Sequence, residues 1–132
     1  MSLDLHIRDH MTKSPITVDR RTTLAEALKI MEERGFRHLP VVDGSKLVGL
    51  VSERELRALE NMQGFNSAGC TVEDFSLVEP YSVAPNALVR DVAFDMATRK
   101  IGSAAVIENG EVVGVFTTID ALRLLVDLLS AK

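Results

Sequence analysis

The feature that most constrains the fold of this chain is an internal duplication. At an offset of 65 residues, the segment from Ile7 to Leu59 matches the segment from Val72 to Leu124 without a gap. The identical pairs are Asp9/Asp74, Pro15/Pro80, Val18/Val83, Met31/Met96, Arg34/Arg99, Val41/Val106, Val48/Val113, Gly49/Gly114 and Leu59/Leu124. Because the match keeps its register through a proline, a glycine and every apolar block, we interpret the chain as two copies of one structural unit.

Each copy shows the same order of expected elements, β-α-β-β-α. A proline-marked extended segment is followed by an amphipathic helix, whose apolar residues recur at helical spacing. The first such helix is expected to be capped by Thr22 or Thr23 and to end at Gly35, and its counterpart to be capped by Asn86. Two strands and a closing helix complete each copy, at residues 39–43, 46–51 and 53–62 and at residues 104–108, 111–116 and 118–129.

These elements predict a mixed α/β (α+β) fold. The strands of each pair are joined by short turns, and Asn109-Gly110 is a strong hairpin signal because both central residues of a type I′ turn need positive φ. One such unit cannot cover both faces of its sheet, whereas two units related by a pseudo-twofold axis can pack through their sheets. We assign residues 7–60 to the first repeat, the turn-rich residues 61–71 to a linker and residues 72–129 to the second repeat.

Composition narrows the class of protein. The net charge of −4 argues against a general nucleic-acid-binding protein, which carries a basic excess. No apolar run approaches the roughly 18 residues of a membrane span, and the first residues lack the pattern of a signal peptide. The single cysteine, Cys70, excludes an intrachain disulfide and fits a reducing compartment. We therefore expect a cytoplasmic protein that binds neither nucleic acid nor membrane.

Three motifs, in order and duplicated, resemble those of the cystathionine-β-synthase-type (CBS) domain. They are the opening at residues 7–12, the Leu39-Pro40-Val41-Val42-Asp43 strand, and the ending Gly-x-x-(Ser/Thr)-x-x-(Asp/Glu) at residues 49–55 and 114–120. The resemblance covers about residues 7–128, and a tandem pair of this kind resembles a Bateman module. It implies a stand-alone regulatory protein that requires no cofactor, forms a homodimer and transmits its state to a protein partner. The implied ligand is adenosine-containing: AMP, ADP or ATP, with S-adenosylmethionine or NAD less favoured.

The ending motif has two chemical interpretations. An aspartate one turn into a helix can accept hydrogen bonds from the two ribose hydroxyls, while a Ser or Thr at the helix N-terminus can meet a phosphate oxygen. The same spacing is also that of a capping box, in which both side chains satisfy backbone N–H groups. The second repeat carries Thr117 and Asp120. The first carries Ser52 and Glu55, and this glutamate departs from the aspartate of the family.

By the resemblance, each of two ligand clefts combines residues of both repeats. The main nucleotide cleft would contain Thr12, Lys13, Ser14, Ile16, Arg37, His38, Pro40, Thr117 and Asp120. In it, Ile16 and Pro40 would flank the purine, and Arg37 and His38 would meet the phosphate charge. The opposite cleft would combine Ser52 and Glu55 with Leu77, Tyr81, Gly102, Ser103 and Ala104. It lacks a basic residue at the positions equivalent to Arg37 and His38, so we expect one working site per chain.

Two other interpretations stay open. A ligand-free dimeric interaction module is the main alternative, and the apolar run at residues 121–129 is compatible with burial in its interface. A catalytic fragment is the weaker one, because the sequence contains no recognisable catalytic triad, phosphate-binding glycine loop or paired-carboxylate motif. His6 and His10 have a spacing that suits a metal, but no third ligand is evident. We therefore expect neither enzymatic activity nor a metal site.

Overall fold

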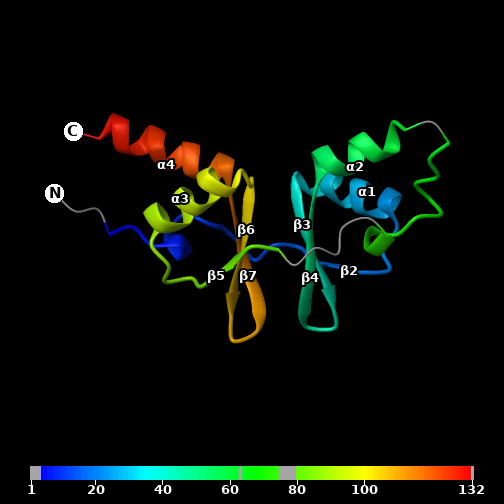
Figure 1. Ribbon diagram of the computed structural model, residues 1–132, viewed down its shortest axis with the longest axis horizontal. Coiled ribbons are helices and arrows are strands. Elements are labelled where there is room, and N and C mark those ends of the chain that lie inside the picture. Colours follow the sequence, from blue (N-terminus) through cyan, green and yellow to red (C-terminus); the bar gives the residue numbers. More distant parts are fainter. Residues whose placement is uncertain (1–3, 63, 75–79, 132) are drawn as a thin grey trace. The chain divides into compact units, whose positions relative to one another are not determined.

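The computed structural model describes residues 4–62, 64–74 and 80–131, and its ribbon is drawn in Figure 1. The chain divides into two compact units. The first unit consists of residues Ile16–Pro80, and the second unit combines Met1–Pro15 with Tyr81–Lys132. Each unit contains its own sheet and its own hydrophobic core.

The first unit is built around a three-stranded sheet. Its strands are β2 (Val18–Asp19), β3 (His38–Asp43) and β4 (Lys46–Ser52), in the order β2-β3-β4. Strand β2 runs parallel to β3, and β3 pairs with β4 as an antiparallel hairpin. The helices are α1 (Leu24–Arg34), α2 (Glu53–Glu60) and the short 3-10 helix η2 (Val72–Asp74).

The second unit repeats this arrangement and adds a strand. It contains β5 (Ser82–Val83), α3 (Val89–Arg99), β6 (Ser103–Glu108), β7 (Glu111–Thr117) and α4 (Thr118–Ser130). Two elements from the start of the chain join it: the 3-10 helix η1 (Ile7–Asp9) and strand β1 (Thr12–Lys13). The sheet order is β1-β7-β6-β5, with β1 antiparallel to β7. The predicted mixed fold and its order of elements are confirmed.

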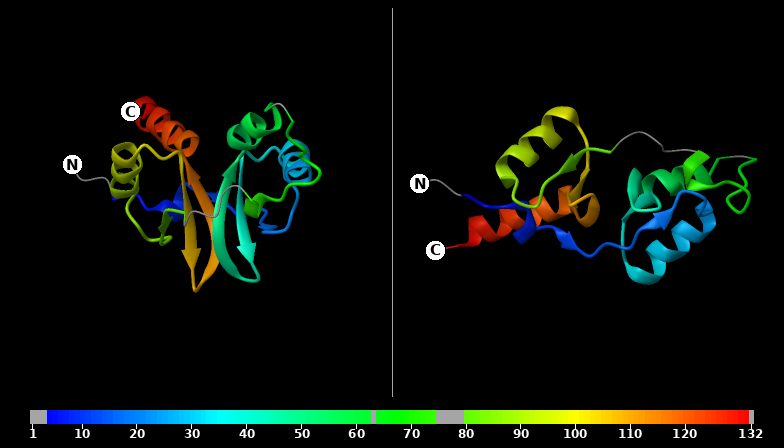
Figure 2. Two further views of the ribbon diagram at one scale, coloured as in Figure 1. Left: turned by 45° about the vertical axis from the view of Figure 1, so that its right-hand side comes forward. Right: turned by 90° about the horizontal axis from the view of Figure 1, so that it is seen from below.

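Within each unit, both α-helices lie on the same face of the sheet (Figure 2). Helices α1 and α2 contact β3 and β4, and helices α3 and α4 contact β6 and β7. Buried leucines, valines and methionines of these helices pack against alternate residues of the strands, as period-2 strands and amphipathic helices require. The predicted packing of the repeats through their sheets stays a prediction.

Local signals set most of the helix ends. Thr23 caps α1 in a reciprocal capping box with Glu26, and Gly35 ends the same helix in the left-handed region at φ 71°, as predicted. The prediction that Asn86 caps α3 is wrong. The N-cap of that helix is Leu88, which makes no side-chain cap bond. The first helical N–H, from Val89, instead donates to the carbonyl of Leu5 at 2.8 Å.

The opening segments of the two repeats are exchanged, so that each packs in the unit that contains the rest of the other repeat. Residues 5–8 hydrogen-bond to residues 85–89 in the second unit, and residues 70–73 bond in the same register to residues 20–24 in the first unit. The side chains of Ile7 and Val72, equivalent in the duplication, are both fully buried. The opening segment of each repeat therefore packs into the core that the other repeat forms.

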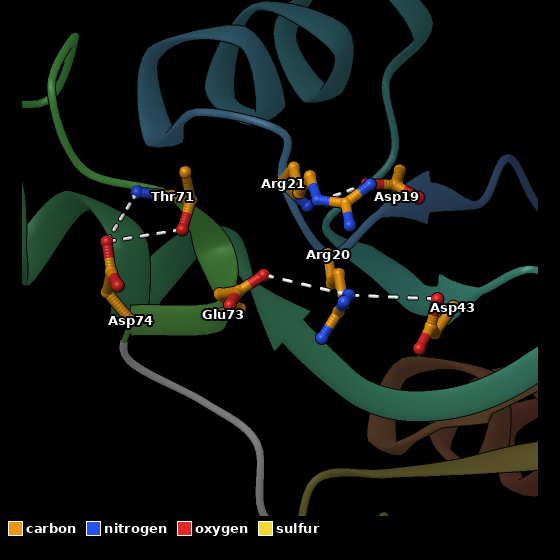
Figure 3. Close-up of polar contacts among 7 residues, drawn as sticks. All are labelled: Asp19, Arg20, Arg21, Asp43, Thr71, Glu73 and Asp74. Carbon is orange, nitrogen blue, oxygen red and sulfur yellow. Dashed lines mark hydrogen bonds and ion pairs between the residues drawn. The ribbon is translucent and has the colours of Figure 1, made fainter.

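Charged side chains reinforce this contact in the first unit (Figure 3). The Nε of Arg20 lies 3.7 Å from an oxygen of Asp43 and 3.9 Å from an oxygen of Glu73. Asp74 accepts hydrogen bonds from the backbone N–H and the hydroxyl of Thr71. The ion pairs of Arg20 join η2 to the ends of β2 and β3, and the bonds to Asp74 fix the residue before η2.

No helix of the described residues has the length and apolar character that a membrane span requires.

The predicted linker, residues 61–71, packs partly on the first unit, because Phe65 and Cys70 contact its core.

Candidate functional site

Asp120 is the only charged side chain that is buried among the described residues, with 8% of its surface exposed. It is the third residue of α4. Its Oδ2 accepts hydrogen bonds from the backbone N–H of Thr117 at 2.9 Å and from the Thr117 hydroxyl at 3.1 Å. The Thr117 hydroxyl oxygen in turn accepts from the N–H of Asp120 at 3.2 Å. The capping interpretation of the ending motif therefore holds in the structure.

Strand β1 brings a third side chain to this carboxylate. Its antiparallel pairing with β7 places Thr12 opposite Val115 and Lys13 opposite Gly114. The Thr12 hydroxyl then lies 3.4 Å from Oδ1 and 3.5 Å from Oδ2 of Asp120. Residues 108 positions apart in the sequence thus meet at the N-terminus of α4.

The close approach of β1 requires a glycine on the neighbouring strand. A Cβ atom at Gly114 would lie 2.9 Å from the carbonyl oxygen of Thr12 and would overlap the sulfur of Met11. Glycine is the residue that allows another backbone to come this near. The absence of a side chain at Gly114 therefore allows β1 to bring Thr12 to the carboxylate of Asp120.

The first repeat contains the same capping box in a different setting. Glu55 Oε1 accepts from the N–H of Ser52 at 3.2 Å and from its hydroxyl at 2.9 Å, but the glutamate side chain is exposed. In the duplication, the residue equivalent to Thr12 is Leu77, which has no hydroxyl and lies outside the described residues. The described geometry at Glu55 is that of a helix cap.

The other residues predicted for the main cleft are divided between the two units. Lys13 and Ser14 are exposed in the second unit, next to Thr12. The first unit contains the remaining four: Ile16 and His38, which are half-buried, Arg37, which is exposed, and Pro40, which is fully buried. Only Thr12, Thr117 and Asp120 are joined by described side-chain contacts, so the role of the other six residues stays a prediction.

The backbone around Arg37 mirrors that of its counterpart in the second repeat. The carbonyl of Arg37 accepts from the N–H of Glu53 at 2.8 Å, and the carbonyl of Gly102 accepts from the N–H of Thr118 at 3.0 Å. Each bond fixes the segment before a strand to the first turn of the closing helix. The two repeats thus share a scaffold here, and they differ in presenting Arg37 at one position and Gly102 at the other.

Tyr81, predicted for the opposite cleft, makes contacts that sequence reasoning missed. Its hydroxyl donates to Asp95 Oδ2 at 2.9 Å, and the guanidinium carbon of Arg99 lies 4.7 Å from the ring centroid. Burial raises the pKa of Tyr81, and the hydrogen bond to Asp95 raises it further. Asp95 and Arg99 lie one turn apart on α3, but no sequence motif links them to Tyr81. Ser103, from the same predicted cleft, pairs with Thr117 across β6 and β7.

In the part of the chain that the structure describes, no three His, Cys, Asp or Glu side chains gather as metal ligands. The contacts of Asp120 are those of a hydrogen-bond acceptor. Near the N-terminus of a helix, a carboxylate acceptor flanked by two hydroxyl groups suits a polyhydroxylated or phosphorylated small molecule.

The CBS domain family matches this chain in two copies, at residues 7–60 and 72–127. The chain is also similar to inosine-5′-monophosphate dehydrogenase of Korarchaeum cryptofilum, with 34% identity over 115 residues. That match covers 86% of this chain but 22% of the enzyme, so the chain spans about a fifth of the length of this relative.

Two solved structures have the same fold and carry adenosine compounds. One is the CBS domain pair of protein MJ0100 in complex with 5′-methylthioadenosine and S-adenosyl-L-methionine, with a TM-score of 0.83 and 27% identity over 96% of this chain and 99% of that one. The other is CBSX2 in complex with AMP, with a TM-score of 0.78 and 25% identity over 95% of this chain and 98% of that one.

Proposed function

The chain belongs to the CBS domain family, and on that ground we propose that it is a regulatory module that binds an adenosine-containing ligand. The observation that carries the proposal is the meeting of Thr12, Thr117 and the buried carboxylate of Asp120 at the N-terminus of α4. The adenosine compounds bound by the CBS pair of MJ0100 and by CBSX2 support it. AMP, ADP or ATP is the proposed ligand, ahead of S-adenosylmethionine and NAD.

The carboxylate of Asp120 has acceptor capacity that its capping role does not use. Oδ2 accepts two short hydrogen bonds from Thr117, whereas Oδ1 has one long contact with Thr12. A carboxylate offers about four acceptor positions, and a buried one is stabilised when they are filled. In the proposal, the ribose hydroxyls of the ligand donate to Asp120.

The phosphate of the ligand would be met by the helix dipole and by cations. The N-terminus of α4 provides the positive end of the dipole. Lys13 is exposed on β1, next to Thr12. In the proposal, Arg37 and His38 also contact the phosphate. Ile16 and Pro40 contact the purine. Ser14, which is exposed directly after β1, is the remaining residue of the proposed site.

We propose one ligand site per chain. The residues of the other candidate cleft, Ser52, Glu55, Tyr81 and Ser103, are less suited to a nucleotide. Glu55 is exposed, and the Tyr81 hydroxyl is bound by Asp95 within its own unit. The full proposal is a non-catalytic cytoplasmic homodimer that passes its ligand state to a protein partner.

A ligand-free dimeric interaction module is the second candidate function. The observation that favours it is the row of exposed apolar side chains on α4, among them Leu122, Val126 and Leu129. In that case the helix surface, and not the carboxylate of Asp120, would carry the activity.

Calorimetric titration with AMP, ADP, ATP, S-adenosylmethionine and NAD tests the proposal. We expect one of these to bind near one per chain and to lose binding in Asp120→Ala. The matched control is Glu55→Ala, which removes the equivalent capping carboxylate of the first repeat and is expected to retain binding. If the folded protein binds none of them, the sensor function is wrong and the interaction module remains.

A further inference from the structure

A shallow groove in the second unit lies beside the turn that joins β6 and β7 (Figure 1). Its volume of about 380 Å³ lies within the range of sites that bind small molecules. Three segments line it: η1, the residues after β5 and the end of the β6–β7 hairpin. They provide, among others, Arg8, Pro85, Asn86, Ile107, Glu108 and Asn109. None of these residues belongs to the proposed adenosine site.

The duplication shows what fills the equivalent place in the first unit. The residues that correspond to Arg8, Pro85 and Glu108 are Glu73, Arg20 and Asp43. The N–H of Arg8 donates to the carbonyl of Pro85 at 2.9 Å, and the equivalent bond of the first unit, from Glu73, is 3.1 Å long. The side chain of Arg20 reaches between Glu73 and Asp43 (Figure 3), whereas proline has no such side chain. We therefore interpret the groove as the place that Arg20 fills in the first unit.

Glu108 lacks the cations that neutralise its counterpart. In the first unit, Asp43 contacts Arg20 and lies opposite Lys46 across its hairpin. Glu108 instead lies opposite Glu111, and no ion pair among the described residues includes it. Two carboxylates opposite each other on a hairpin repel. A cationic group that entered the groove would therefore be attracted to Glu108.

Arg8 provides the opposite charge in the same groove. Its side chain is exposed, and within the described part of the chain it takes part in no ion pair. In the first unit, the Nε atom of Arg20 lies 3.7 Å from one of the two equivalent carboxylates and 3.9 Å from the other. The fold thus brings these two positions close enough for one small molecule to contact both.

The groove therefore suits a ligand that carries both charges. A guanidinium group binds a carboxylate through two parallel hydrogen bonds, and a carboxylate accepts hydrogen bonds from an ammonium group. The amide side chains of Asn86 and Asn109 can donate and accept further hydrogen bonds. Pro85 and Ile107 provide an apolar surface for a short side chain. A ligand with only one charge would meet a like charge in the groove.

From these observations we infer that the groove binds a free α-amino acid, with its carboxylate on Arg8 and its ammonium group on Glu108. The amino acid is a second ligand, bound within the second unit. The inference goes beyond the adenosine ligand of the proposed function and does not depend on it, because Thr12, Thr117 and Asp120 do not line the groove.

Titration of the isotope-labelled chain with L-alanine, followed by amide NMR spectra, tests the inference. We expect saturable shifts of the backbone amide signals of Arg8, Asn86 and Asn109. N-acetyl-L-alanine and L-alaninamide each lack one of the two charges and are expected to bind about tenfold more weakly. The absence of shifts at these amides overturns the inference, and so does an analogue that binds as tightly as L-alanine.

Removal of single charges tests the two assigned partners. Arg8→Gln and Glu108→Gln are each expected to weaken L-alanine binding by about five- to tenfold. The matched control is Glu111→Gln, which removes a carboxylate of the same hairpin outside the groove and is expected to change the affinity by less than about twofold. The exchange Arg8→Glu/Glu108→Arg should regain much of the loss, because the ligand can then bind in the reverse orientation. Equal losses in Glu111→Gln, or none in the other two single variants, overturn the assignment.

AMP titration separates this inference from the proposed function. Glu108→Gln is expected to bind AMP as the wild type does. A chain that binds AMP but not L-alanine contradicts only the amino-acid site. A chain that binds L-alanine but no adenosine compound contradicts only the nucleotide site.

Discussion

At the scale of single residues, the two repeats show how one motif serves two purposes. Asp120 and Glu55 each accept hydrogen bonds from the residue that caps their helix. The aspartate is buried and is contacted by Thr12, whereas the longer glutamate is exposed. A buried carboxylate is costly unless its oxygens are satisfied. Asp120 is therefore the carboxylate for which ligand hydroxyls would contribute most.

Thr12→Val tests the contribution of the β1 hydroxyl. The substitution keeps the branched shape and leaves the Thr117–Asp120 cap intact. We expect AMP affinity to fall by roughly fivefold, which corresponds to the loss of a hydrogen bond worth about 1 kcal/mol. Calorimetric titration measures the change, and Thr98→Val, at an exposed position of α3, is the control. Unchanged affinity would exclude Thr12 from the site.

Tyr81→Phe removes the hydroxyl that donates to Asp95. We expect the free energy of unfolding at pH 7 to fall by about 1 kcal/mol, since a partly buried hydrogen bond is lost. The folded protein raises the pKa of Tyr81 above its ordinary value of 10.0. The hydroxyl therefore stabilises the fold fully below pH 10, and this contribution is lost as the pH rises through the raised pKa.

Urea unfolding of both proteins at neutral pH and above pH 10 measures the effect. The difference between wild type and Tyr81→Phe should shrink at the higher pH. A difference that stays constant would show that ionisation of Tyr81 is not linked to folding.

At the scale of elements, the sequence predicts what local signals determine. Both hairpins and all four α-helices lie close to their predicted ranges, because amphipathic periodicity and turn residues act over a few positions. The cap of α3 was predicted wrongly, since Leu5 provides the hydrogen-bond acceptor from a distant part of the chain. The pairing of β1 with β7 could not be predicted from periodicity either, because a two-residue strand carries no pattern.

Gly114→Ala tests how β1 is positioned. A methyl group at this residue meets the backbone of Thr12 and the side chain of Met11, and only the side chain can move aside at little cost. We expect a loss of stability of about 1–3 kcal/mol together with weaker AMP binding, because Thr12 is displaced from Asp120. Thermal unfolding and calorimetry report the two effects.

The double variant Gly114→Ala/Met11→Ala separates the two contacts. It relieves the overlap with the sulfur atom but not the contact with the Thr12 carbonyl. We expect AMP binding to stay weak in this variant. Full recovery would mean that Met11 alone limits the approach of β1.

At the scale of the whole molecule, the duplication predicts two repeats but not how they share their segments. Residues 5–8 and residues 70–73 are equivalent in sequence and make the same backbone hydrogen bonds. The apolar pattern of the sequence therefore allows residues 5–8 and residues 70–73 each to pack on either repeat. The candidate site depends on this choice, because the segment that carries Thr12 reaches Asp120 only when the start of the chain joins the second repeat.

Charge distinguishes the two choices in the first unit. Arg20 lies between Asp43 and Glu73 (Figure 3). The residue equivalent to Glu73 in the other segment is Arg8. If residues 5–8 packed on the first repeat, this arginine would lie next to Arg20, and like charges at such a distance repel. The ion pairs of Arg20 thus favour the exchanged arrangement.

Glu73→Arg tests whether charge selects the exchanged arrangement, because it places at residue 73 the arginine that residues 5–8 carry at the equivalent position, Arg8. We expect Glu73→Ala to lower the free energy of unfolding by at most about 1 kcal/mol, as for other half-exposed ion pairs. Glu73→Arg should cost more, since it adds repulsion to the loss of attraction, and Arg20→Glu in the same chain should recover part of that cost. Urea unfolding of the three variants measures these differences. If arginine at residue 73 costs no more than alanine, charge does not select the exchange, and the shapes of Ile7 and Val72 in their two cores must do so.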